Sequence, residues 1–274
     1  MTKCLKTGGG VMPRVLTVIP TLRDYPSVTD DLAQERDVEI VVAIVSSSRV
    51  LYEFLSRHGK SSAMIFYVEP SLREHVGVRV GKAINYALRH FDLRDFDYLL
   101  KIDADVRLPP GYIKRCILLN ADLVGMGPFM LVKTEPFLKY LDGKWPQTSA
   151  DDAYIKLKFQ SLGLKVYGEL PGLVENRRRG GGDWRYYYFR GIDDYRMGID
   201  PILEAIIVLR LVRGRRRLLP LFTLLGYVAA LVAGEERYDF APFVLKRLSL
   251  PSLEYIIGKL LSAGVGRRQG SSTK

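Results

Sequence analysis

The chain has 274 residues, of which 47% are hydrophobic and 26% are charged, and its two cysteines are Cys4 and Cys116. This length is enough for a large domain with an extension, and the composition excludes a disulfide-stapled miniprotein, a disordered chain and a multi-pass transporter. Basic residues outnumber acidic ones by 41 to 30, and the formal net charge of +11 predicts a polyanionic partner. Without an apolar N-terminal stretch, the sequence predicts a cytoplasmic protein with free thiols.

The first hundred residues alternate β-branched runs with helical patterns. Four apolar runs are typical of buried strands: 15–19, 38–45, 63–68 and 98–102. Residues 80–91 repeat apolar side chains at helical spacing, with Lys82 and Asn85 off the apolar face. This repetition predicts an α/β fold, with a mostly parallel sheet flanked by helices. In such sheets ligands bind beyond the carboxyl ends of the strands.

The second half of the chain changes character near residue 190. A helix is predicted over 151–162, ending at Gly163. Residues 177–217 carry 11 Arg and 5 acidic residues, and the 17 residues of 218–234 carry no charge. We therefore expect four segments: a disordered tail over 1–13, the main domain over 14–190, a helical extension over 191–262 and a second tail over 263–274.

The strongest local signal is the pair Asp103 and Asp105, which directly follows a predicted strand. At a strand end, one carboxylate can reach a sugar hydroxyl while the other binds a hard divalent cation. Such a cation would leave positions open for phosphate oxygens. An isolated Asp-x-Asp at a turn is more often simply solvated, so the argument depends on this position after the strand.

A second acidic pair, Asp151 and Asp152, opens the predicted helix about fifty residues later. The helix dipole accounts for one carboxylate at that end without any catalysis. Two adjacent carboxylates exceed what a cap requires. Asp152 is the candidate base for deprotonating an attacking hydroxyl.

Candidate binding residues follow the first two predicted strands and lie on the first long helix. Pro20 and Thr21 form a tight turn before Arg23, where backbone amides and a hydroxyl can meet a nucleotide. Ser46 can donate to a base or a ribose, or it can cap the next helix. Lys82 can pair with a phosphate, or it can lie on a solvated face.

In this order and spacing, the residues resemble the nucleotide-sugar-dependent glycosyltransferases of family 2, which have the GT-A fold. The matching elements are Val-Ile-Pro-Thr at 18–21, Gly81-Lys82 with Asn85, Asp-Ala-Asp-Val at 103–106, and Asp151-Asp152. The similarity continues through Tyr188-Phe189-Arg190-Gly191 and Gly226-Tyr227. There it looks like the C-terminal extension of prokaryotic members that build surface polysaccharides or lipid-linked glycans.

The resemblance implies an inverting, metal-dependent transfer of a sugar from a nucleotide-sugar donor to a lipid-linked or glycan acceptor. It implies that Asp103 contacts the ribose or sugar, that Asp105 with Asp103 holds Mn2+ or Mg2+, and that Asp152 is the base beside Asp151 at the donor. Family members usually carry an Asp after the second strand that binds the nucleotide base. This chain has Val45-Ser46-Ser47-Ser48 there, so the identity of the nucleotide base in the donor stays undetermined.

A peripheral membrane contact is predicted over residues 213–234. The uncharged stretch is shorter than the roughly 20 apolar residues of a spanning helix and contains Pro220 and Gly226. The preceding arginines would be attracted to anionic headgroups on the inner face of the cell membrane. A helical hairpin packed on the main domain is the alternative.

Two other functions compete with the transferase. Arg177–Arg179 with the aromatic residues 184–189 suggest nucleic-acid binding, which leaves both acidic pairs unexplained, so we expect no nucleic-acid partner. The second competing function is that of a nucleotidyltransferase that activates sugar phosphates. Such enzymes usually carry a Gly-rich basic loop after the first strand, and residues 22–28 contain no Gly.

Overall fold

The structure is a computed structural model that describes residues 12–21, 26–58, 63–69, 71, 74–168, 170–172, 174–175, 183–215 and 218–248. The chain divides into two compact units, residues 1–180 and 181–274. The predicted boundary at residue 190 falls inside helix α7 (Trp184–Arg196), within the second unit. Apart from Met12 and Pro13, the predicted tails lie outside the described residues.

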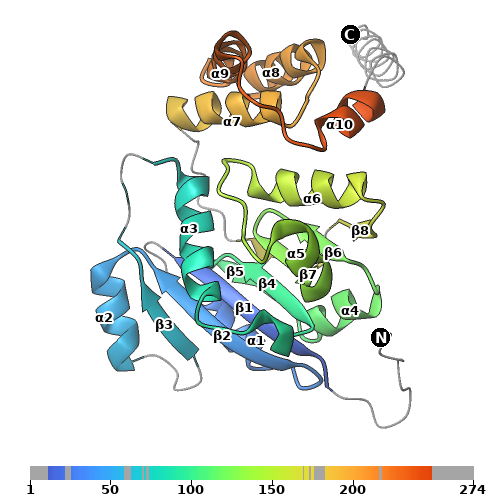
Figure 1. Ribbon diagram of the computed structural model, residues 1–274. Coiled ribbons are helices and arrows are strands. Elements are labelled where there is room, and N and C mark those ends of the chain that lie inside the picture. Colours follow the sequence, from blue (N-terminus) through green and yellow to red (C-terminus); the bar gives the residue numbers. More distant parts are fainter. Residues whose placement is uncertain are drawn as a thin grey trace, which may run out of the picture. The chain divides into compact units, whose positions relative to one another are not determined.

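The first unit is built on a seven-stranded sheet with the strand order β3-β2-β1-β4-β7-β6-β8 (Figure 1). Its strands are β1 (Arg14–Thr21), β2 (Glu39–Ser46), β3 (Ala63–Tyr67), β4 (Tyr98–Ile102), β6 (Leu123–Met126), β7 (Phe129–Lys133) and β8 (Val166–Tyr167). Strand β1 pairs in parallel with β2 and β4, whereas β7 runs antiparallel to both of its neighbours. The predicted α/β fold with a mostly parallel sheet is confirmed.

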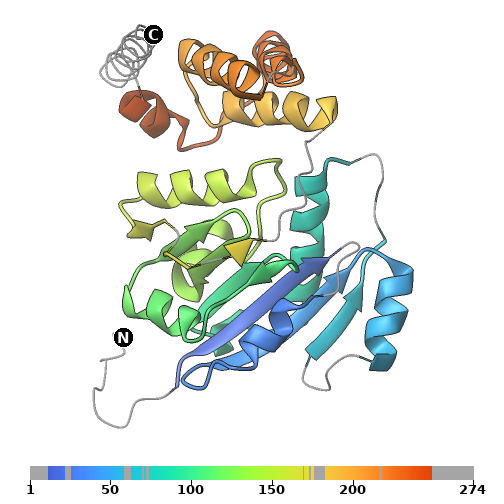
Figure 2. The same cartoon turned by 180° about the vertical axis from the view of Figure 1, so that it is seen from behind.

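Helices cover both faces of this sheet (Figures 1 and 2). One face packs against α1 (Val28–Leu32), α2 (Arg49–His58) and α4 (Tyr112–Leu118), and the other against α3 (Val76–Leu88), α5 (Thr134–Leu141) and α6 (Asp151–Ser161). In β1, Val15 and Ile19 point to the first layer, while Leu16 and Val18 point to the second. These side chains are fully buried, which explains why a central strand reads as an unbroken apolar run.

All four predicted strands are present, and the helix predicted over 151–162 is α6. Helix α3 begins at Val76, four residues before the predicted start at residue 80. Its cap explains the difference, because the His75 Nδ1 atom accepts a hydrogen bond of 3.1 Å from the Gly77 amide. A histidine cap is not among the usual start signals in a sequence.

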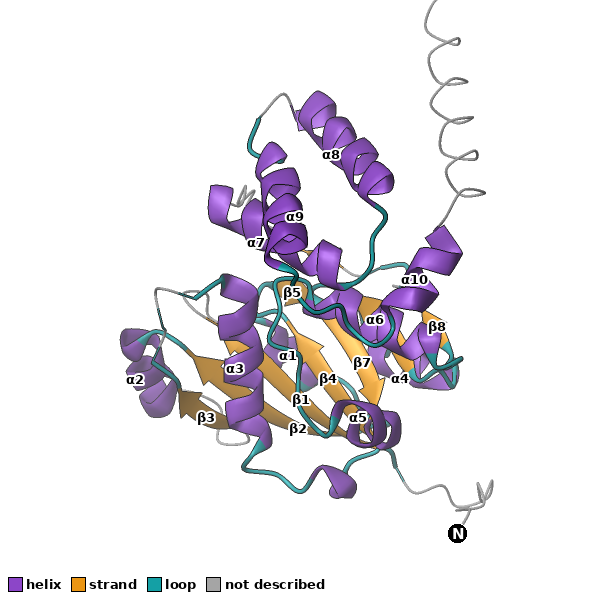
Figure 3. Cartoon of the chain, turned by 45° about the horizontal axis from the view of Figure 1, so that its top comes forward, coloured by secondary structure: helices purple, strands orange, loops and turns teal. Residues whose placement is uncertain are grey.

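The chain order of the strands reverses between β1 and β4, because β2 and β3 lie on the other side of β1 (Figure 3). Ligands of open α/β sheets bind at such a switch point, beyond the carboxyl ends of the strands. Directly after β4, the short strand β5 (Val106–Arg107) pairs with β9 (Val174–Glu175) in a second, two-stranded sheet.

Asp31 of α1 anchors β5. Its buried carboxylate accepts two hydrogen bonds of 2.8 Å from the Arg107 guanidinium and one of 2.9 Å from the Leu108 amide. A forked ion pair of this kind fixes orientation as well as distance. Asp31 therefore holds the segment that follows Asp105.

The second unit consists of helices: α7, α8 (Pro201–Arg215), α9 (Leu221–Ala233) and α10 (Ala241–Leu248). Helices α7 and α9 cross where Gly191 faces Gly226. A Cβ atom on Gly191 would lie 1.9 Å from the Thr223 carbonyl oxygen, and one on Gly226 would lie 1.9 Å from the Tyr188 carbonyl oxygen. The two backbones are therefore in direct contact. Of the extension predicted over 191–262, the described residues up to 248 form helices and their connections, and the remainder lies outside the described residues.

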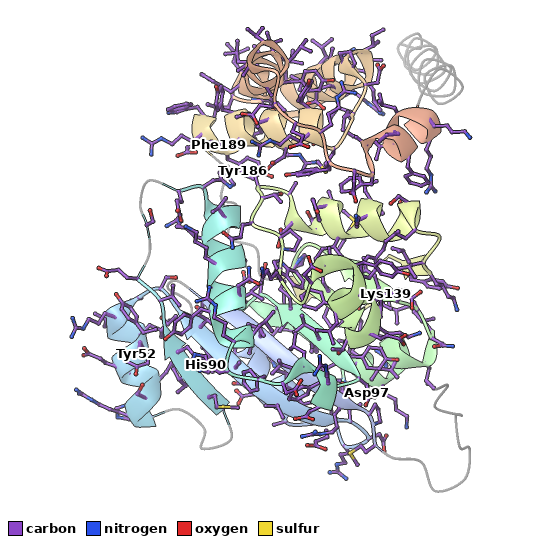
Figure 4. All side chains as sticks on the ribbon, viewed as in Figure 1. Tyr52, His90, Asp97, Lys139, Tyr186 and Phe189 are labelled. Atoms are coloured by element: carbon purple, nitrogen blue, oxygen red, sulfur yellow. The ribbon has the colours of Figure 1, made fainter. Side chains whose placement is uncertain are left out.

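The aromatic run that suggested nucleic-acid binding lies on α7, where Figure 4 labels Tyr186 and Phe189. Tyr187 is buried, and the Trp184 ring packs on Phe222 of α9 with 5.8 Å between ring centroids. Part of this run therefore forms the interior of the helical unit. Within the part of the chain that the structure describes, no helix has the length and apolar character needed to cross a membrane.

Candidate active site

A cavity of about 330 Å³ opens at the switch point of the first unit. Its lining comes from the carboxyl ends of β1, β2 and β4 and from α3: Pro20, Thr21, Ser47, Val76, Arg79, Val80, Ala83, Asp103, Ala104 and Asp105. Because β1, β2 and β4 run parallel, residues distant in sequence reach one rim. We call this cavity the switch-point pocket.

Asp103 and Asp105 flank a buried alanine at the pocket. Ala104 packs into the sheet core with 6% of its surface exposed, while both aspartates are half-buried and line the cavity. The backbone of this turn is held by a 2.8 Å hydrogen bond from the Asp103 amide to the Pro128 carbonyl oxygen. The predicted acidic pair therefore meets Pro20 and Thr21 in one cavity, although these two residues end strand β1 instead of forming the predicted turn.

A buried lysine lies behind the acidic turn. The Lys101 Nζ atom is 2.7 Å from the Asp103 Oδ1 atom and donates to the Gly127 carbonyl oxygen at 2.7 Å. Burial opposes the charge of this ammonium, but the carboxylates of Asp103, Asp151 and Asp152 outweigh it and raise the pKa of Lys101. Asp103 of the first predicted pair and both members of the second thus act on one cation, which reduces the repulsion between these carboxylates.

The second acidic pair is held by a tryptophan. The Trp145 Nε1–H group donates a 2.7 Å hydrogen bond to the Asp151 Oδ2 atom. Burial raises the pKa of Asp151, while Lys101 and this hydrogen bond oppose the increase. Asp151 therefore has a fixed, supporting position, and its half-buried neighbour Asp152 is the carboxylate that can serve in proton transfer.

Helix α3 braces the segment that carries this tryptophan. The buried Asn85 side chain donates to the Trp145 carbonyl oxygen at 2.8 Å and accepts from the Trp145 amide at 2.6 Å. Gly77 and Gly81 bring α3 against the same segment, since their Cβ atoms would lie 2.3 Å from the Thr148 carbonyl oxygen and 2.5 Å from the Pro146 carbonyl oxygen. Gly81 and Asn85, which the sequence pairs with Lys82, are thus supports for the second acidic pair.

Arg79 is the cationic residue among the described residues that line the switch-point pocket. Its Nε atom is buried and has no hydrogen-bond partner in the described structure. A buried donor without an acceptor is costly, so this guanidinium is suited to an anionic ligand. Sequence analysis missed Arg79, because the predicted helix began one residue after it.

The other predicted binding residues are placed differently. Lys82 forms an ion pair with Glu74 and is not part of the pocket lining. The Ser46 side chain is buried and bonds within its own turn, donating to the Ser48 carbonyl oxygen at 2.9 Å, while Ser47 lines the pocket. Arg23 lies outside the described residues.

The pocket chemistry fits a hard divalent cation. Mg2+ and Mn2+ prefer carboxylate oxygens, and Mg2+ is usually held by one or two carboxylates together with substrate phosphates and water. Asp103 and Asp105 supply such a pair, and Arg79 supplies a phosphate partner. Among the described residues no cluster of three or more potential metal ligands exists.

Comparison with known proteins finds similar solved structures but no matching family model and no matching curated protein. A mannosyltransferase from Pyrobaculum calidifontis in complex with GDP-Man and Mn2+ is 17% identical, with a TM-score of 0.49 over 96% of this chain and 89% of that one. A 4-diphosphocytidyl-2C-methyl-D-erythritol synthase is 9% identical, with a TM-score of 0.43 over 62% and 95%. A glycosyltransferase of Streptococcus pneumoniae is 10% identical, with a TM-score of 0.35 over 58% and 45%. With identities of at most 17% and TM-scores of at most 0.49, the similarity does not establish a function. The function is therefore argued from the pocket itself.

Proposed function

We propose that the protein is a nucleotide-sugar-dependent glycosyltransferase of the GT-A type whose donor binds in the switch-point pocket. The observation that carries this proposal is the position of Asp103 and Asp105, which line one cavity with Thr21 and Arg79 at the carboxyl ends of parallel strands. This combination offers carboxylates for a metal and a guanidinium for a phosphate. A nucleoside diphosphate is the ligand that uses both.

Donor binding divides between two kinds of group. Asp103 and Asp105 would hold Mn2+ or Mg2+, which on binding would neutralise charge on the departing diphosphate. The Arg79 guanidinium donates to a phosphate oxygen, and the Thr21 and Ser47 hydroxyls face the nucleoside. Serine at the position where a base-binding aspartate was expected leaves the base identity to experiment.

The transfer step uses the second acidic pair. Asp152 accepts the proton of the acceptor hydroxyl while the sugar–phosphate bond breaks and the nucleoside diphosphate leaves, which inverts the anomeric centre in a single displacement. Lys101 and Trp145 hold Asp151, and through it the first turn of α6, in place. The buried ammonium also limits the repulsion between Asp152 and the carboxylates at the donor.

The acceptor is proposed to be lipid-linked or a glycan, because α9 has an apolar face that the described residues of its own unit leave exposed. Five large apolar side chains of α9 are exposed: Leu221, Leu225, Val228, Leu231 and Val232. The sequence before α9 adds positive charge through Arg213, Arg215, Arg216 and Arg217. Each of them contributes about 1 kcal/mol to binding near an anionic surface. An anionic membrane surface matches both features, on the cytoplasmic side.

The test is release of nucleoside diphosphate from a panel of nucleotide sugars with Mn2+ and a polyprenyl phosphate in detergent. We expect release with one donor, and at least a hundredfold slower transfer in Asp152→Asn, with donor affinity changed less than twofold. Asp142→Asn, an exposed loop substitution in the same unit, is the matched control. Absence of release with every donor would exclude the proposed function, and undiminished transfer by Asp152→Asn would exclude that residue as the base.

A further inference from the structure

A second cavity, of about 300 Å³, lies within the helical unit, between α7, α8 and α9. Its polar lining comes from Tyr186, Tyr187, Arg190, Asp194, Glu204 and Thr223. The remainder is aliphatic: Ile199, Ile207, Val208 and Leu211. The volume is at the lower end of the range for small-molecule sites, and the proposed transfer reaction does not use this cavity.

The charges in this cavity are unbalanced. The Arg190 Nε atom donates to both oxygens of Asp194, at 2.9 and 3.0 Å, so these two charges compensate each other. Glu204 is 1% exposed and lines the same cavity, and no described residue donates a hydrogen bond to its carboxyl group. When Glu204 is ionised, the lining therefore carries one uncompensated negative charge.

A buried carboxylate to which no described residue donates a hydrogen bond favours the uptake of a proton or a cation. Burial and the neighbouring Asp194 raise the pKa of Glu204 to about 8, although Arg190 opposes the shift. Among the described residues that line the cavity, Arg190 is the only cationic one, and it is already paired with Asp194. A cationic ligand would replace the proton on Glu204, and its binding would be favoured by the same uncompensated negative charge.

The lining selects the kind of cation. A divalent metal ion requires about six oxygen ligands, whereas Asp194 is already engaged by Arg190 and four of the ten lining residues are aliphatic. An alkylammonium places its charge on a carboxylate and its carbon chain on aliphatic side chains. Tyrosine rings add a favourable cation–π surface.

We propose that the cavity between α7, α8 and α9 binds a small organic ammonium ion, with Glu204 as its counter-ion. This site is separate from the switch-point pocket in sequence and chemistry, so it stands or fails independently of the proposed transferase activity. The ligand adds no new charge to the buried cluster, because it exchanges with a proton.

The test is isothermal titration of the full chain with n-butylammonium at pH 7, in phosphate buffer and in HEPES, a bulky zwitterionic buffer with a larger enthalpy of ionisation. We expect saturable binding with proton release, seen as a difference in apparent enthalpy between the two buffers. The neutral 1-pentanol, similar in size, should bind at least tenfold more weakly. No binding of the ammonium, or equal binding of the alcohol, would overturn the proposal.

Two variants localise the site. Glu204→Gln should weaken ammonium binding at least tenfold and abolish the buffer-dependent enthalpy, and Leu211→Trp should block binding by filling the cavity while leaving Glu204 in place. The exposed Glu236→Gln is the matched control and should bind as the native chain does. Unchanged binding by Glu204→Gln, or by a folded Leu211→Trp protein, would contradict the assignment of the cavity.

Discussion

At the scale of single residues, two cations on neighbouring turns of α3 have different roles. Arg79 faces the switch-point pocket with a buried, unpaired Nε atom, whereas Lys82 is paired with Glu74. We expect Arg79→Met to raise the dissociation constant of a nucleoside diphosphate about tenfold or more, since a hydrogen bond to a charged group is worth about 1.5–3 kcal/mol. The same titration of Lys82→Met is the control, and its dissociation constant should change less than threefold. A larger effect of Lys82→Met than of Arg79→Met would assign the phosphate contact to Lys82.

The Trp145–Asp151 contact leads to a second prediction at this scale. Trp145→Phe removes the N–H donor to Asp151, which should cost about 1–3 kcal/mol of unfolding free energy at pH 7, and the smaller buried ring adds a cavity cost that does not depend on pH. The cost should shrink at pH 4, because a protonated Asp151 depends less on a donor. Urea unfolding at the two pH values measures this difference. Trp184→Phe, at a half-exposed tryptophan of the other unit, should show no pH-dependent loss; equal losses at both pH values for Trp145→Phe would argue against an ionised Asp151 partner.

At the scale of elements, the crossing of α7 and α9 depends on two glycines. An alanine at position 191 or 226 would place a methyl group 1.9 Å from a backbone oxygen of the other helix, so the helices must separate. We expect Gly191→Ala and Gly226→Ala each to lower the melting temperature, with a loss of about 1–3 kcal/mol typical of overpacking. Gly234→Asn, at a left-handed position with open space for a side chain, should have little effect. Native-like melting of both alanine variants would show that the helices do not pack this closely.

Glu204 makes the stability of the helical unit depend on pH. Its pKa is raised to about 8 in the folded chain from an ordinary value of 4.5, so folding is favoured while the group is protonated. The unfolding free energy should therefore fall as pH rises from about 4.5 through 8, and the nearby Asp194, whose pKa burial also raises, acts in the same direction. In Glu204→Gln this decline should be smaller, and the variant should be more stable than the native chain at pH 8.5. Denaturant titrations measure the unfolding free energy across this pH range. If it changed with pH to the same extent in both proteins, Glu204 would not be a buried, titrating group.

The elements were largely predictable, whereas the contacts that organise the site were not. Four strands and the acidic turn at Asp103 follow from local apolar runs and their ends, because a strand buried on both faces leaves a clear pattern. The link between Asn85 and Trp145 joins residues sixty positions apart, and the approach of Asp103, Asp151 and Asp152 to Lys101 depends on the sheet. No spacing in the sequence encodes them.

On helix α3, Arg79 lines the pocket, whereas Lys82, the predicted phosphate partner, does not. The histidine cap starts α3 at Val76, which places Arg79 toward the pocket and leaves Lys82 with Glu74. Ser46 and Ser47 exchange roles for a related reason, because successive residues of a strand point to opposite sides. In each case the residue that lines the pocket lies within three positions of the predicted one.

At the scale of the whole molecule, a basic chain with an apolar stripe on α9 should bind anionic membranes. Replacing Leu225 and Val228 together by Asp should reduce co-sedimentation with vesicles rich in anionic lipid at least fivefold, because it removes apolar contact and adds repulsion. Binding should also fall with rising salt and be weak on zwitterionic vesicles. Val50→Asp, at a residue that is 80% exposed on α2, is the control. Equal binding to both vesicle types, or an undisturbed double variant, would contradict the membrane surface.

The central claim is that the switch-point pocket holds a nucleoside diphosphate through a metal at Asp103 and Asp105. Thermal unfolding of the native chain and of Asp105→Asn with each nucleoside diphosphate, with and without Mn2+, tests it most directly, because a ligand at a hundred times its dissociation constant stabilises the folded state by about 2.7 kcal/mol. We predict a rise in melting temperature with one nucleotide that requires Mn2+ and disappears in Asp105→Asn. No metal-dependent rise with any nucleotide, or the same rise in Asp105→Asn, would contradict the claim.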